Sequence, residues 1–135
     1  MFRLVQFLSL GLGLSILAVG CAPPGESGIR SNKRLGQLSA EERNQLCEWK
    51  VSLVKKVAGT ECKGDDDDDG YTVKQEKQGK CEGELISIAS KVDKNPECDS
   101  SVDDFEKCVT DFVKRPCKES KMCEVIRGRQ KPCLE

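Results

Sequence analysis

The chain has 135 residues, a formal net charge of −1 and no histidine. This length suits one small domain, and the near-balanced charge gives no reason to expect binding to nucleic acid. Without histidine, the commonest general base and the Ser-His and Cys-His pairs of nucleophilic catalysis are absent, so we expect no catalytic activity. The nine cysteines are the most informative residues.

The N-terminal residues have the pattern of a bacterial export signal. Arg3 precedes the mainly apolar residues 4–19, and small residues at positions 18–20 lead directly to Cys21. As a helix the apolar stretch would span about 24 Å, less than the ~30 Å of a bilayer core. We therefore expect residues 1–20 to be a lipoprotein signal peptide and Cys21 to be the lipidated residue. Ordinary signal cleavage without a lipid is the alternative.

The cysteine count agrees with acylation of Cys21. Lipid on this residue leaves eight cysteines, which can pair completely. No C-x-x-C motif is present, which disfavours zinc-finger and thioredoxin-like sites and favours structural disulfides in an oxidising compartment. The cysteines expected to form disulfides are Cys47, Cys62, Cys81, Cys98, Cys108, Cys117, Cys123 and Cys133.

Residues 21–38 are predicted to be a flexible tether, because they are rich in Pro, Gly, Ser and charge and have no periodic apolar pattern.

Ala22 stands where the common inner-membrane retention signal has Asp. We therefore expect an outer-membrane location, on the periplasmic face or at the cell surface. The expected partners are this membrane, through the lipid anchor, and an unknown protein or envelope component.

Residues 39–135 are predicted to form one cysteine-rich helical domain. A capping box at Ser39 starts the first helix, and Gly59 is placed to end it. The second helix covers residues 84–92, with Ile86 on its apolar side, and a second capping box at Ser101 starts the third. The expected fold is mainly α, a small disulfide-stapled bundle of three to four short helices with an irregular or short-strand loop at about 60–80.

The helix positions also limit the disulfide pairing. Cys98 and Cys117 flank a helix of about thirteen residues, so they lie about 20 Å apart and cannot bond. Cys47 and Cys108 lie within two different helices and form the favoured helix-to-helix pair. This pair is one choice among 105 possible connectivities.

An acidic run at residues 65–69 matches the calcium-loop pattern D-x-[DN]-x-[DN]-G-x5-E. A solvated loop is the favoured interpretation, because five adjacent aspartates satisfy three pattern positions at once and the flanking helices of such a site are not predicted. Weak calcium binding is the alternative, and no other cofactor is expected. The ligands would be Asp65, Asp67, Asp69, Tyr71 and Glu76.

The C-terminal residues 114–131 hold seven basic residues and two glutamates. This net positive charge could face anionic lipopolysaccharide or an acidic partner. A solvated surface that balances the acidic run is the favoured interpretation.

Short motifs around the cysteines resemble those of small cysteine-rich exported lipoproteins from myxobacteria and related bacteria. The resemblance covers most of the chain from residue 38 onward, whereas the Asp run and the basic tail depart from that pattern. It implies export, anchoring and a disulfide framework, and it implies no activity. The matching motifs are Leu46-Cys47-Glu48-Trp49, Pro96-Glu97-Cys98, Val102-Asp103-Asp104-Phe105-Glu106-Lys107-Cys108 and Pro116-Cys117.

Two classes of function are consistent with these features. The first is a lipid-anchored interaction or structural module of the cell envelope. The second is an exported effector such as a peptidase inhibitor, in which disulfides would rigidify an exposed binding loop at residues 63–80.

Overall fold

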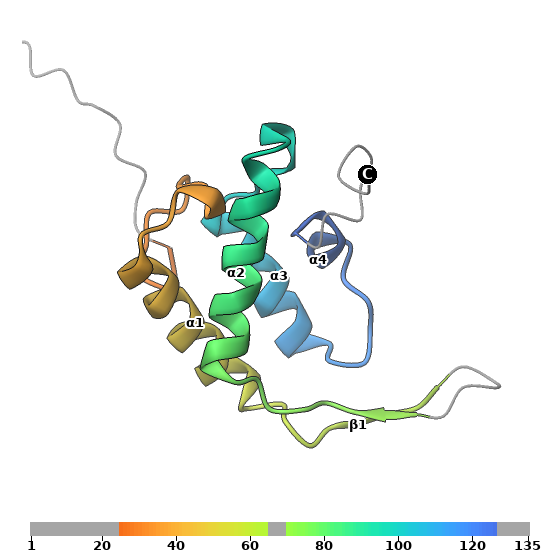
Figure 1. The fold of residues 1–135 in the computed structure, drawn as a ribbon. Coiled ribbons are helices and arrows are strands. Elements are labelled where there is room, and N and C mark those ends of the chain that lie inside the picture. The colour runs from red at the N-terminus through yellow and green to blue at the C-terminus, as the bar shows by residue number, and fades with distance from the viewer. Residues whose placement is uncertain (1–24, 65–69, 127–135) are drawn as a thin grey trace, which may run out of the picture.

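The computed structural model describes residues 25–64 and 70–126 of the chain. Helices α1, α2 and α3 pack together, α4 lies against α3, and a small antiparallel hairpin extends beyond the bundle (Figure 1). This architecture confirms the predicted mainly helical fold with a short-strand loop. The elements are α1 Ala40–Val54, β1 Glu61–Cys62, β2 Tyr71–Thr72, α2 Gln78–Val92, α3 Val102–Lys114 and α4 Lys121–Ile126, with 3-10 turns η1 Leu35–Gln37 and η2 Pro96–Cys98.

Both predicted capping boxes are present. The Ser39 hydroxyl accepts the backbone N–H of Glu42 at 3.2 Å, and the Glu42 carboxylate accepts the backbone N–H of Ser39 at 2.8 Å. The same reciprocal pair joins Ser101 and Asp104 at the start of α3. Each box satisfies backbone donors that the first helical turn leaves without a partner.

Helix α1 ends earlier than predicted. It stops at Val54, and turns follow up to Gly59. Gly59 has a φ of +88°, a backbone conformation that glycine adopts without steric cost. Its N–H donates to the carbonyl of Val73 at 2.8 Å, so this glycine starts the hairpin rather than ending the helix.

Helix α2 begins at Gln78, six residues before the predicted start at position 84. Its buried residues are Cys81 and Leu85, which are spaced by one helical turn and pack into the core. The placement of Ile86 on the apolar side was wrong, since this side chain is 54% exposed. The next residue on a helix is turned by about 100°, which carries Ile86 away from the face that Leu85 buries.

The hydrophobic core draws on segments spread over the whole described chain. Side chains from η1, α1, α2 and α3 meet in a single cluster. Because this cluster is small, disulfides add stability that apolar burial in a domain of this size supplies only in part. The largest fully buried side chains are Leu35, Leu46, Leu85, Val102, Cys47 and Cys81.

The prediction of a flexible tether over residues 21–38 was wrong for its described part. Ile29, Leu35 and Leu38 are at most 4% exposed and belong to the core cluster. The backbone of this segment also hydrogen-bonds to residues 100–103. Three irregularly spaced apolar side chains therefore fix a segment whose composition alone suggests a linker.

Candidate functional site

Three disulfides connect the described elements. One joins α1 to α2, one joins β1 to the turn after α3, and one joins α3 to α4. Cys98 is also disulfide-bonded, whereas Cys21 and Cys133 lie outside the described residues. The three pairs are Cys47–Cys81, Cys62–Cys117 and Cys108–Cys123, with Cα–Cα distances of 5.7, 5.2 and 4.8 Å.

The favoured pairing of Cys47 with Cys108 was wrong. Helix α2 packs against α1 and brings Cys81 to Cys47, while α4 packs against α3 and brings Cys123 to Cys108. The exclusion of a Cys98–Cys117 bond is confirmed, since Cys117 is bonded elsewhere.

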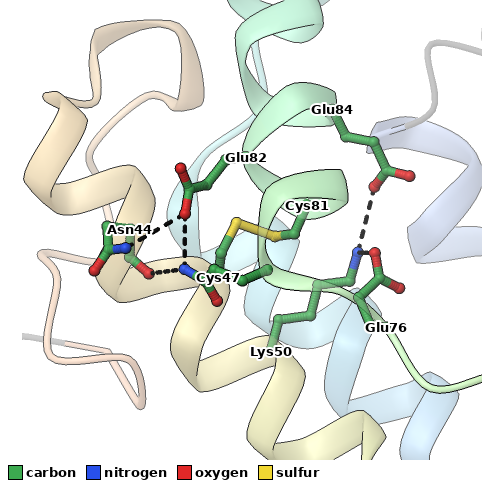
Figure 2. The surroundings of a disulfide bond; sticks show 8 residues. Asn44, Cys47, Lys50, Glu76, Cys81, Glu82 and Glu84 are labelled. Carbon is green, nitrogen blue, oxygen red and sulfur yellow. Dashed lines mark hydrogen bonds and ion pairs between the residues drawn. A yellow bond between two sulfur atoms is a disulfide. The ribbon is translucent and has the colours of Figure 1, made fainter.

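Polar side chains lie on one side of the disulfide between α1 and α2 (Figure 2). The Gln78 amide donates to the Glu82 carboxylate at 2.9 Å and to the Asn44 carbonyl at 3.0 Å. The Asn44 amide donates to the same carboxylate at 3.3 Å. These hydrogen bonds hold the start of α2 against α1, although Lys77 at the N-cap makes no capping bond through its side chain.

A charged group lies on the other side of the same disulfide (Figure 2). Lys50 Nζ is 3.2 Å from Glu76 and 3.4 Å from Glu84, and it lies 5.7 Å from the centre of the Phe105 ring. The Lys50 and Glu76 side chains are only 15% and 16% exposed. Lys50 thus links α1 to both other large helices.

The proposed calcium ligands are only partly within the described residues. Asp65, Asp67 and Asp69 lie outside them, and Glu76 is ion-paired with Lys50. Tyr71, which would ligate calcium through its backbone carbonyl, lies in β2. Within residues 25–64 and 70–126, no three Asp, Glu, Cys or His side chains come together as a metal site. Calcium binding therefore stays a prediction.

The hairpin is fixed at its base. The Cys62–Cys117 disulfide ties β1 to the turn after α3, and the Tyr71 hydroxyl donates to the Pro116 carbonyl at 3.1 Å. A Cβ on Gly70 would lie 2.5 Å from the Cys62 carbonyl oxygen, so only glycine permits this close approach of the two backbone segments of the hairpin. Strands β1 and β2 lie outside the helical bundle (Figure 1).

Sequence reasoning missed a buried carboxylate on α3. Glu106 is 6% exposed, and its oxygens accept the backbone N–H groups of Glu26 at 3.1 Å and Ser27 at 2.8 Å. A signal was present, because Glu106 shares the apolar stripe of α3 with Phe105 and Val109. A charged residue on such a stripe needs a polar partner when the face is buried.

An open depression of about 450 Å³ adjoins this carboxylate. Its rim carries charges of both signs, including Glu26, Lys107 and Lys114. The Asp103 carboxylate accepts a hydrogen bond from the Lys107 ammonium and raises the pKa of that lysine. Lys107 therefore keeps its positive charge at neutral pH.

No helix in the described ranges is both long and apolar enough to cross a bilayer. Comparison with protein-family models, with curated proteins and with solved structures gives no match to this chain.

Proposed function

We propose that this protein is exported, anchored by lipid at Cys21 to the bacterial outer membrane, and acts there as an interaction or structural module rather than as an enzyme. The observation that carries the proposal is the set of disulfides that join α1 to α2, α3 to α4, and the hairpin to the turn after α3. Such a density of disulfides in a small domain is typical of oxidising compartments outside the cytoplasm. Residues 1–20, followed by Cys21, have the pattern of an export signal, which agrees with such a compartment.

A module function follows from how the helices are held. Disulfides and hydrogen bonds between helices fix the surface before any partner arrives, which lowers the entropy cost of binding. The chain also has no histidine to serve as a general base. These features favour recognition by a rigid surface over chemistry in a cleft.

Membrane fractionation tests the anchor. The wild-type protein is expected in the outer-membrane fraction, and Cys21→Ser is expected in the soluble periplasmic fraction with its disulfides intact. Ala22→Asp is the matched variant, because it keeps the acylated cysteine and should move the protein to the inner membrane. A Cys21→Ser protein that stays in the membrane fraction would contradict the proposal.

The hairpin supports a second candidate, a peptidase-inhibitor-like function. Its base is fixed by Cys62–Cys117 and by the Tyr71 hydroxyl, as expected for a preorganised binding loop. An inhibitor must titrate at least one peptidase from a panel of secreted enzymes at a defined stoichiometry. Cleavage of the hairpin without inhibition by every enzyme tested would exclude this candidate.

Weak calcium binding by residues 65–76 is the remaining alternative. Calcium titration of the purified protein at about 0.1–1 mM, the range of extracellular calcium modules, would detect it. The matched variant is Glu76→Gln, which removes one ligand carboxylate.

A further inference from the structure

The first described residues are held firmly against α3. The backbone N–H groups of Glu26 and Ser27 donate to the buried Glu106 carboxylate, and the N–H of Gly25 donates to the carbonyl of Ile29 at 2.7 Å. Ile29 is 4% exposed within the core, and the Gln45 amide donates to the Ser27 carbonyl at 2.7 Å. Residues 25–29 therefore belong to the folded domain and do not act as a linker.

Very little chain separates this fixed segment from the proposed lipid site. Only three residues lie between Cys21 and Gly25. A fully extended chain advances about 3.6 Å per residue, so Gly25 can lie at most about 14 Å from the acylated cysteine. This reach is smaller than the diameter of the domain itself, since a domain of this size has a radius of gyration of about 13 Å.

The surface next to Gly25 is polar. It carries charges of both signs, and we call it the anchor face; it consists of Gly25, Glu26 and Ser31 together with Asp103, Glu106, Lys107, Thr110, Asp111 and Lys114 of α3. Within the described residues, the exposed large apolar side chains are Tyr71 and Ile86, which lie on the hairpin and on α2. The anchor face therefore suits contact with the polar head-group layer and not insertion among acyl chains.

We infer that the head groups of the bilayer cover the anchor face, and that the hairpin is presented on the side of the domain that faces away from the membrane. This inference rests on the proposed lipid anchor at Cys21. In Figure 1 residues 25–31 and the β1–β2 hairpin lie at opposite sides of the molecule. A partner in the envelope would then meet the hairpin first.

Paramagnetic broadening of amide signals tests this orientation. The protein extracted from membranes is placed in phospholipid nanodiscs that contain a lipid with a gadolinium chelate on its head group. Broadening falls with the sixth power of distance, so amides at 25–34 and 103–107 are expected to broaden several-fold more than those at 61–62 and 71–74. Equal or stronger broadening of the hairpin amides would overturn the inference.

The mass of the same sample separates this inference from the proposed anchor. An unacylated protein would refute the anchor, whereas an acylated protein with a broadened hairpin would refute the orientation alone.

Two variants test whether the short connection sets the orientation. Inserting about twelve Gly and Ser residues between Pro24 and Gly25 adds an average reach of about 20 Å and should reduce the difference in broadening at least about twofold.

Gly25→Ala should also reduce the difference in broadening, because the added methyl group would overlap the Glu106 carboxylate and displace it from its backbone donors. Gly83→Ala is the matched control, since a Cβ there meets no neighbour. An unchanged pattern after linker insertion would show that the connection does not position the domain.

Discussion

Replacing Cys47 and Cys81 together by alanine should destabilise the domain more than removing either of the other two described disulfides. This disulfide joins α1 to α2, and both of its cysteines are fully buried in the core. Its loss therefore releases the unfolded chain and also leaves space in the packed interior of the folded protein.

The magnitude follows from sequence separation and burial. Cys47–Cys81 spans 34 residues and Cys62–Cys117 spans 55, for which the chain-entropy model gives about 3.8 and about 4.2 kcal/mol. Removing a buried sulfur costs about 1 kcal/mol more through lost packing. This cost applies to both Cys47 and Cys81, but in the second pair only to Cys62, because Cys117 is exposed. The totals are about 6 and about 5 kcal/mol, so burial outweighs the longer loop.

Thermal unfolding followed by far-UV circular dichroism measures this difference. A difference of 1 kcal/mol corresponds to about 4–8 °C in the melting temperature of a small domain. The Cys47→Ala/Cys81→Ala protein should melt lowest, then Cys62→Ala/Cys117→Ala, then Cys108→Ala/Cys123→Ala, whose loop spans only 15 residues. If the Cys62/Cys117 variant melted lowest, loop length and not burial would set the contribution of each disulfide.

Three further predictions concern single residues. Leu85→Ala should cost about 2–5 kcal/mol of unfolding free energy because Leu85 is fully buried, whereas Ile86→Ala on the exposed side should change it by less than about 0.5 kcal/mol in urea unfolding. Ser101→Ala should cost about 1 kcal/mol by removing the capping box of α3, and an unchanged urea midpoint would contradict this. The Lys33 ammonium, and then the Ser39 backbone N–H, hold the pKa of the Glu42 carboxyl below its ordinary value. The stabilisation by Glu42 is therefore fully present above the pKa of about 4.3 that a glutamate has in the unfolded chain. It is lost as the pH falls through the lower pKa of Glu42 in the folded protein. Glu42→Gln should therefore weaken the dependence of the melting temperature on pH in the acid range.

Local signals in the sequence predict the parts of the fold that depend on neighbouring residues. Helix α3 has the predicted bounds because its capping box, its apolar stripe and the proline after it all lie within one short stretch. Helix α2 was only partly predicted, since Gly79 and Gly83 lower its helix propensity. Its first turns are held instead by Cys81, Gln78 and their partners on α1.

The remaining features depend on contacts between distant residues. Glu106 binds backbone groups 79 and 80 positions away, and nothing in residues 25–29 alone indicates such a partner. The pairing of the cysteines likewise depends on which helices pack together. Cys47 was predicted to pair with Cys108, but it pairs with Cys81 because α2 packs against α1. Periodicity places Glu106 on a buried face and so indicates that it needs a polar partner, but neither composition nor periodicity indicates which residues are the partners.

The intact mass of the membrane-extracted protein, measured after treatment with a thiol reagent but without reduction, tests the central claim most directly. The account predicts the mass of residues 21–135 plus that of the acyl chains on Cys21, with no thiol modified by the reagent. An unacylated N-terminus, or several thiols that react with the reagent, would contradict it.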